Sequence, residues 1–483
     1  MIQIKSFAKL LVALVLVFTT VSCQSQGIQD RTVTVYLRGV SMARVSFSPL
    51  TGSNAYKPIK VFEQVQNGQN VTFTIKKELI PSDFQLRFDY FDVNSGKPSA
   101  SEQRIFVNKQ NVNLNINPIY ATIADSVIFS DNDKENKIYQ QFSIQNQSIK
   151  ENIGLIQMVL SKYDDKNSSF YKEGLKEYKQ RIKQHADWLK QQAKEHKDLF
   201  VSHTFVLQEV PEIDFSLDEK ARKNAMLENY INIIDFKDTL LTHSFDYRKW
   251  LDNFVSMHFD RSYTAVQTDS ALVSAGRKLI ERAKTGDPVV CGKMLDYFFE
   301  GYESMGMESG IQMLAEHLNN PKCPATKKEA IIKRIEGISN LKIGTTAPDF
   351  DITDTENSSI NFHNFGKSKP YKLLMIWSAD CEHCQEVTQQ LYMFYTNSHV
   401  SSKFDVLAVS IDETETEIPK WESNIKDLPK WTHALSKGGL LSQVAKMYYV
   451  VSTPVLVIVD TESNKIVGLP KTARDVAMFF SEN

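Results

Sequence analysis

The chain has 483 residues and a formal net charge of −2, with 42% hydrophobic and 24% charged residues. This length exceeds what one hydrophobic core supports and predicts about three domains. The near-neutral net charge gives no basic footprint for nucleic-acid binding and no strongly acidic field. Beyond the N-terminal segment, no stretch approaches the roughly 20 apolar residues of a membrane-spanning helix.

The N-terminus has the pattern of an export signal. Two lysines precede an apolar stretch over residues 10–21, and Cys23 follows directly after Ser22. A small residue before a cysteine at this point resembles the lipobox of bacterial lipoproteins, although Thr20 stands where an aliphatic residue is usual. We predict a signal peptide over residues 1–22 and lipid attachment at Cys23. The alternative is an ordinary cleaved signal with an incidental cysteine.

Export would place the chain outside the cytoplasm, where disulfides persist. We expect a lipid-anchored protein of the cell envelope that faces the periplasm, with the outer membrane as the favoured membrane. No acidic run follows Cys23, so display on the outer face of the cell is not predicted.

The region after the signal alternates between apolar and polar side chains. The alternation is clear over residues 33–37, 71–75 and 112–116, and Asn67-Gly68 is a turn signal between such stretches. Period two is typical of strands with one buried face. We predict a small antiparallel, β-sandwich-like domain over residues 23–123 and interpret it as a spacer or docking module.

The period changes to 3.6 over residues 124–340, which predicts an all-helical middle domain. One long helix has apolar residues on a single face, at Leu175, Tyr178, Ile182, Ala186 and Leu189. Similar patterns recur over residues 219–235, 270–283, 292–305 and 311–318. His185 and His196 fall on the charged long helix, and we expect both to be exposed to solvent.

Four residues in the last third carry the clearest chemistry. Cys381-Glu382-His383-Cys384 follows an apolar strand pattern over residues 373–377 and begins a predicted helix that runs to about residue 397. A thiol at a helix N-terminus faces unpaired backbone N–H groups, which stabilise its thiolate. The second thiol is one helical turn away, close enough for a disulfide. We predict a redox-active pair with Cys381 as the exposed nucleophile and Cys384 as the buried resolving thiol.

Further strands and helices alternate through the same region. Strand patterns cover residues 404–411, 455–460 and 465–468, and helix patterns cover 418–425, 440–448 and 472–480. Alternating strands and helices predict one α/β domain over residues 341–483. Thr453-Pro454 directly precedes the strand at 455–460, and residues 343–350 lead into the domain.

This region resembles the TlpA-like thiol–disulfide oxidoreductases of the bacterial envelope, because the lead-in segment, the C-x-x-C and the Thr-Pro occur in this order. The resemblance implies a thioredoxin-like fold, protein thiols or disulfides as partners, an unidentified membrane electron donor and no cofactor. It also implies a cis bond at Thr453-Pro454, which would present backbone to an extended peptide. We assign Trp377 to the same substrate-binding surface, and His383 to tuning of the Cys381 thiolate.

Two positions depart from the family pattern. Met375 stands where thioredoxins often have a buried acid, and Val387 stands where TlpA-like reductases usually have a glutamate. Glu386 is the neighbour of Val387, and we consider it for redox tuning, with water held by Glu382 as the other candidate proton acceptor for Cys384.

The remaining cysteines, Cys291 and Cys323, lie in the helical region. They are either two buried thiols or one structural disulfide, which would contribute roughly 3–4 kcal/mol through chain entropy. Their spacing does not fit a four-cysteine zinc site, and the histidines show no metal-binding pattern, so we predict no metal.

The sequence therefore predicts a multidomain α+β chain: a β domain, a helical domain and a thioredoxin-like domain. This order is similar to that of a group of envelope lipoproteins. The predicted function is a membrane-anchored thiol–disulfide oxidoreductase. One alternative is a binding or assembly lipoprotein in which the thioredoxin fold is only structural. Another is a peroxiredoxin-like peroxidase, which would have proline at the position of Leu374.

Overall fold

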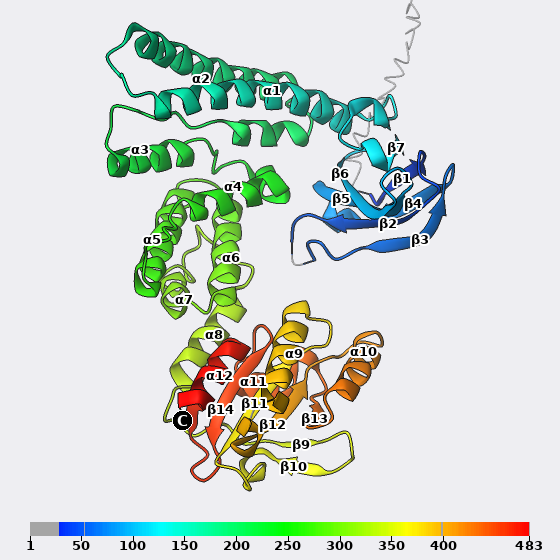
Figure 1. Ribbon diagram of the computed structural model, residues 1–483, viewed down its shortest axis with the longest axis vertical. Coiled ribbons are helices and arrows are strands. Elements are labelled where there is room, and N and C mark those ends of the chain that lie inside the picture. Colours follow the sequence, from blue (N-terminus) through cyan, green and yellow to red (C-terminus); the bar gives the residue numbers. More distant parts are fainter. Residues whose placement is uncertain (1–28, 53, 398, 483) are drawn as a thin grey trace, which may run out of the picture. The chain divides into compact units, whose positions relative to one another are not determined.

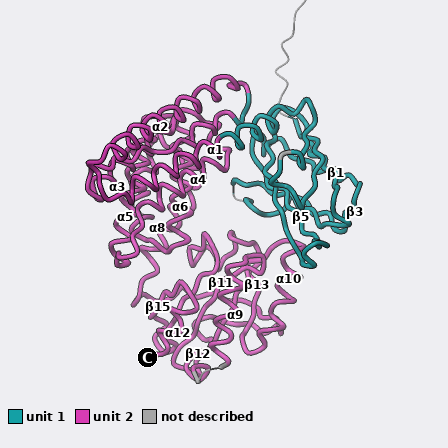
Figure 2. The backbone as a smooth tube through the Cα atoms, turned by 45° about the horizontal axis from the view of Figure 1, so that its top comes forward, with its two compact units in different colours: residues 1–145, 199–201 teal, residues 146–198, 202–483 magenta. Residues whose placement is uncertain are grey.

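The computed structural model describes residues 29–52, 54–397 and 399–482. The predicted signal peptide and Cys23 lie outside the described residues. From the N-terminus, β sheets are followed by a helical middle region and then an α/β domain (Figure 1). The chain divides into two compact units (Figure 2). The first ends at Gln145 and also holds Leu199–Val201, and the second holds the helices from Asn146 onward and the α/β domain.

The N-terminal region is a sandwich of two four-stranded sheets around one core. The first sheet has the order β4 (Asn70–Ile75), β1 (Arg31–Leu37), β7 (Val112–Ile116) and β8 (Val127–Phe129). The second has the order β3 (Lys60–Gln66), β2 (Met42–Pro49), β5 (Ser82–Asp92) and β6 (Lys97–Val107). All pairings are antiparallel except β1 with β7, which is parallel. Strand β8 ends beyond residue 123, where we predicted the β domain to end.

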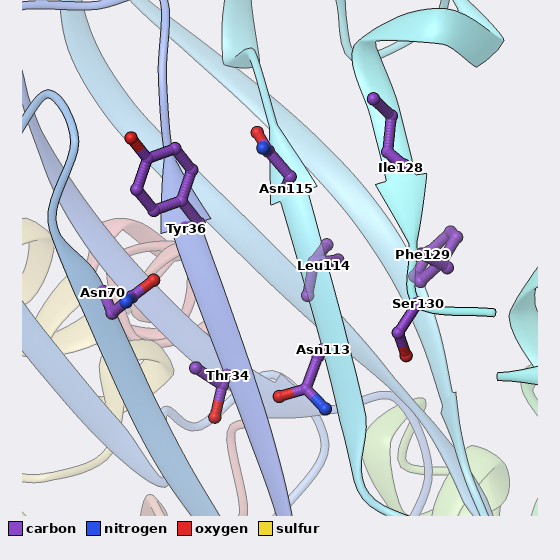
Figure 3. A pocket seen from close by; sticks show the side chains of 9 residues that line it. All are labelled: Thr34, Tyr36, Asn70, Asn113, Leu114, Asn115, Ile128, Phe129 and Ser130. Carbon is purple, nitrogen blue, oxygen red and sulfur yellow. The ribbon is translucent and has the colours of Figure 1, made fainter. Parts of the chain in front are cut away.

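A shallow pocket of about 380 Å³ lies on the first sheet. Figure 3 shows that Tyr36 and Asn115 lie side by side on neighbouring strands, with Thr34 and Asn113 next to each other further along the sheet. The lining has no thiol, imidazole or carboxylate. It therefore offers no thiol chemistry.

The middle region is helical, as predicted. Its α-helices are α1 (Lys134–Lys162), α2 (Ser169–Glu195), α3 (Glu219–Ile231), α4 (Phe245–Ser256), α5 (Ala265–Ala283), α6 (Pro288–Ser304), α7 (Glu308–Ala315) and α8 (Lys328–Asn340). Among the described residues, none of the helices combines the length and apolar character that a membrane crossing requires.

The prediction for His185 was wrong, because its side chain is only 1% exposed. It lies on the same face of α2 as the buried Tyr178, Ile182 and Leu189, since these positions follow the helical spacing. Its Nε2 is 2.8 Å from Asn146 Oδ1. Burial lowers the pKa of His185 to about 4, so the imidazole is neutral.

Cys291 and Cys323 form a disulfide, which settles the choice that the sequence left open. Their Cα atoms are 4.8 Å apart. Both residues are fully buried, at 0% exposure, in the core that α3 to α8 share.

The α/β domain is built on a five-stranded sheet of order β13 (Thr432–Leu435), β12 (Phe404–Ser410), β11 (Tyr371–Trp377), β14 (Val455–Asp460) and β15 (Ile466–Gly468). β11, β12 and β13 are parallel, whereas β14 and β15 run antiparallel to them. Its α-helices are α9 (Glu382–Asn397), α10 (Glu417–Asn424), α11 (Gln443–Met447) and α12 (Ala473–Glu482). A hairpin of β9 (Asp351–Thr353) and β10 (Ser359–Asn361) precedes the sheet.

Both faces of this sheet are buried, because successive strand residues point to opposite faces. Leu373 and Met375 pack with α9 and α12, while Leu374 and Ile376 pack with α11 and the lead-in segment. This explains why β11 appears in the sequence as a continuous apolar run. Because β11, β12 and β13 are parallel, their C-terminal ends lie at the same end of the sheet.

Candidate dithiol site

The dithiol lies at the edge of the sheet where β11 ends. Residues 378–380 form the turn, and α9 begins at Glu382, so Cys381 is the N-cap residue. Its carbonyl oxygen accepts a hydrogen bond from Gln385 N at 3.1 Å. Its Sγ accepts one from the backbone N–H of Cys384 at 3.2 Å. A side-chain acceptor for this N–H is the usual N-cap interaction, and here a sulfur provides it.

The two thiols have opposite environments. Both are free; Cys381 is half-buried and Cys384 is fully buried. The hydrogen bond from the Cys384 thiol is the main cause that lowers the pKa of Cys381 to about 6, and the Cys384 N–H and the Thr453 side chain add to it against the opposing effect of burial. The charge of His383 is the smallest of these contributions. The contact with Cys381, together with burial, raises the pKa of Cys384. The site therefore holds a thiolate at Cys381 and a protonated thiol at Cys384 near neutral pH.

Thr453 and Pro454 lie against this pair. The bond between them is cis, as predicted from the sequence. The carbonyl oxygen of Thr453 is 3.6 Å from Cys381 Sγ. The topology explains the proximity, because β14 runs antiparallel to β11 and Val455 pairs with Ile376. The start of β14 therefore lies beside the end of β11.

Two predicted site residues lie elsewhere. The Trp377 side chain is only 1% exposed and packs in the domain core, so it is a core residue and not part of a substrate-binding surface. Glu386 is exposed and accepts a hydrogen bond from Gln390 Nε2 at 3.1 Å. Two positions along a helix differ by about 200° in direction, so Glu386 faces away from the buried Cys384. Its predicted role in redox tuning is not supported.

Buried apolar side chains occupy the two positions where the family often has acids. Met375 and Val387 pack in the same core cluster as Cys384.

The described part of the chain also has no group of three or more His, Cys, Asp or Glu side chains arranged to hold a metal ion.

Asp412 is a residue of the site that sequence reasoning missed. It is 1% exposed and follows the end of β12. Its carboxylate accepts hydrogen bonds from Ser378 Oγ at 2.6 Å, Ala379 N at 2.9 Å and Ser410 Oγ at 2.7 Å. It thereby fixes the turn that presents Cys381. The available signal was a carboxylate just after a buried strand, one strand away from the C-x-x-C.

Comparisons with known proteins agree with this geometry. Residues 370–466 match a family model described as thioredoxin-like. Over 127 residues the chain is 28% identical to thiol-disulfide oxidoreductase ResA of Bacillus thuringiensis subsp. konkukian, covering 26% of this chain and 68% of ResA.

Two solved structures are also similar. A thioredoxin domain of a thiol-disulfide oxidoreductase from Bacteroides vulgatus has 27% sequence identity and a TM-score of 0.26, with 29% of this chain and 97% of that one covered. A thioredoxin-like protein from Bacteroides caccae has 18% identity and a TM-score of 0.38, with 57% and 98% covered.

The family match spans the two thiols as well as Thr453 and Pro454. The family match and the ResA relative support a TlpA-like thiol–disulfide oxidoreductase with a thioredoxin-like domain over residues 370–466.

Proposed function

We propose that the chain is a membrane-anchored thiol–disulfide oxidoreductase of the cell envelope that acts on protein cysteines through Cys381 and Cys384. The observation that carries the proposal is the asymmetry of the two thiols. Cys381 is accessible and has a pKa lowered to about 6, whereas Cys384 is buried with a raised pKa. An attacking thiolate beside a protonated reserve thiol is what a two-step exchange needs.

In the first step, the Cys381 thiolate attacks one sulfur of a substrate disulfide. A mixed disulfide forms, and the other substrate sulfur leaves as a thiolate. Cys384 then loses its proton and attacks the Cys381 sulfur, which forms the Cys381–Cys384 disulfide and releases the second substrate thiol. The substrate gains two electrons from the enzyme and two protons, one released by Cys384 and one taken from solvent by the thiolate that left first. The reverse sequence oxidises a dithiol, and the redox poise sets the direction.

The Thr453 carbonyl supports a protein as the substrate. An extended peptide can pair with backbone at this edge, as in β-strand addition. The carbonyl is 3.6 Å from the attacking sulfur, so a paired peptide would bring its disulfide to Cys381. A thiol reductant in the membrane would return the pair to the dithiol form.

The sequence pattern around Cys23 supports the membrane anchor. Lipid attachment at this residue would hold the dithiol in the periplasm at the membrane surface. A Cys23→Ser variant should leave the membrane fraction after export. Recovery of the wild-type protein in the soluble fraction would contradict the anchor but leave the redox proposal intact.

A trapping experiment tests the exchange. The Cys384→Ser variant cannot complete the second step, so it should form a stable mixed disulfide with a peptide that contains one disulfide. The Cys381→Ser variant is the matched control and should form none. If neither variant traps the peptide and the wild type does not reduce it, the alternative of a binding lipoprotein with a structural thioredoxin fold is favoured.

A further inference from the structure

The residues just before Thr453 are held by the helical region. We name residues 449–452 the stem, because they carry Thr453 and Pro454 to the dithiol. Three side chains of the helical region bond to the stem. Asn340 Nδ2 donates to Tyr449 Oη at 2.7 Å, Lys333 Nζ donates to the Val450 carbonyl at 2.7 Å, and Glu303 Oε1 accepts from Ser452 Oγ at 3.1 Å. Between these points, the Val451 side chain packs against the core of the helical region.

Glu303 is itself held in one orientation. It lies in the last turn of α6, and its other carboxylate oxygen accepts a hydrogen bond from Arg334 Nε of α8 at 2.8 Å. The two side chains are only 17% and 15% exposed. Because charge-assisted hydrogen bonds are strong and directional, Arg334 fixes the Glu303 oxygen that faces the exposed Ser452.

Helix α8 approaches the stem closely. A Cβ added to Gly337 would lie 2.8 Å from the Tyr449 Cβ, so the glycine lets the helix and the stem touch. Lys333 lies one turn earlier on the same helix and donates to the carbonyl of Val450, the stem residue after Tyr449. The stem is therefore in direct contact with α8 and is anchored on both sides of Val451.

The anchored stem ends at the residue that faces the thiols. Ser452 is covalently joined to Thr453, whose carbonyl contacts Cys381 Sγ and whose side chain contributes to the lowered pKa of Cys381. A shift of the stem would move both groups of Thr453 relative to the sulfur. The helical region can therefore influence the dithiol although its residues precede it by many positions in the chain.

We propose that Lys333 and Glu303 are positioning residues that hold the stem, and with it Thr453, in the geometry needed for docking a protein substrate. The inference deepens the proposed function, on which it rests for the docking of a peptide at Thr453. It gives the helical region a role in exchange. The alternative is that these side chains only stabilise the contact between two parts of the chain.

The test compares two variants with two matched controls in the full chain. Lys333→Met and Glu303→Ala remove the anchors. Lys328→Met and Glu300→Ala are the controls on the same two helices, because Lys328 bonds to Asn319 and Glu300 bonds to Lys327, all within the helical region. For each protein we measure the pH midpoint of Cys381 alkylation. We also measure KM for the reduction of two substrates, a peptide disulfide and a small disulfide without a peptide backbone.

Loss of an anchor should shift the alkylation midpoint, because both Thr453 groups next to the sulfur move, and raise KM for the peptide disulfide by about threefold to tenfold, the size of one lost hydrogen bond. KM for the small disulfide should change much less, since it needs no strand pairing. The double variant should lose more than either single variant, because the anchors bind different stem residues. The control variants should match the wild type.

Two results separate the possibilities. If Lys333→Met and Glu303→Ala lower the melting temperature but leave the midpoint and the peptide KM equal to those of the controls, the residues are only structural and the inference is wrong. If the wild type fails to reduce the peptide but both variants still shift the alkylation midpoint, the positioning role stands and the proposed substrate class is wrong.

Discussion

The Cys381 sulfur caps the helix that contains its partner thiol, because it accepts the Cys384 backbone N–H at 3.2 Å. The same peptide unit that places the second sulfur thus stabilises negative charge on the first. Oxidation to the disulfide removes that charge, so the helix N-terminus favours the reduced pair over the oxidised pair.

The first prediction concerns reactivity. Alkylation of the reduced protein should occur at Cys381 and follow a titration with a midpoint near pH 6, since the pKa of this thiol is lowered to about 6. Cys384 should react far more slowly because it is buried and its pKa is raised. Mass spectrometry of the alkylated peptides gives both rates. Equal rates would contradict the assignment of the attacking thiol.

The second prediction concerns stability and pH. An unfolded thiol has a pKa of about 8.5, so between about pH 6 and 8.5 the unfolded reduced chain binds more protons at Cys381 than the folded chain does. The free energy of unfolding that this thiol contributes should therefore increase as pH rises through that window and be lost as pH falls through 6. The measurement is the difference in the free energy of unfolding between the reduced wild type and Cys381→Ser, obtained by denaturant unfolding at several pH values. A difference that does not vary with pH would contradict it.

The third prediction concerns His383. Its charge favours the Cys381 thiolate but is the smallest of the contributions, and the side chain is exposed. A His383→Gly variant should have a slightly less stable reduced form and hence a more negative potential, by less than about 30 mV. Equilibration with glutathione measures the shift. Glu382→Gly, at the neighbouring exposed position, controls for the effect of glycine in the first turn. A positive shift specific to His383→Gly would contradict the electrostatic explanation.

The fourth prediction concerns Asp412. In Asp412→Asn, the amide group offers one acceptor oxygen where the carboxylate has two, so at least one buried donor loses its partner. We expect a loss of about 1–3 kcal/mol in the free energy of unfolding and slower thiol exchange. Asp405→Asn is the control: Asp405 lies near the other end of β12 and pairs with Lys369 in a partly exposed contact. Equal effects of the two variants would show that Asp412 does not act through the turn.

The fifth prediction concerns the buried disulfide. Replacing both Cys291 and Cys323 by alanine should lower the free energy of unfolding by about 3–4 kcal/mol, because the bridge closes a loop with a sequence separation of 32 residues. Calorimetry of the oxidised proteins measures the loss. The activity of the folded variant should be kept, since the bridge is not part of the dithiol site. Loss of exchange without loss of stability would contradict this structural role.

Much of the α/β domain could be predicted because its central strands are long and buried on both faces. The predicted strand over residues 455–460 coincides with β14, and the predicted strand over 373–377 lies within β11. Strands β9, β10 and β13 were not predicted; each has only three or four residues, which show little periodicity, although the equally short β15 was predicted.

The thiols and the Thr-Pro could be predicted because their chemistry is contained in short motifs. Asp412 could not, since its role depends on the parallel pairing of β11 with β12. The contact between Glu303 and Ser452 joins positions 149 residues apart, and no local pattern encodes it. Sequence periodicity does place His185 on the buried face of its helix, but the charged residues around it suggested exposure.

The burial of Cys291 and Cys323 has a consequence for a molecule that carries a reactive thiolate. Disulfide exchange requires the attacking sulfur to reach the bridge in line with it, and both sulfurs of this bridge belong to residues with no exposed surface. Neighbouring copies of the chain therefore cannot attack it while it is folded. The Cys381–Cys384 pair can therefore be oxidised and reduced repeatedly while the Cys291–Cys323 disulfide stays intact.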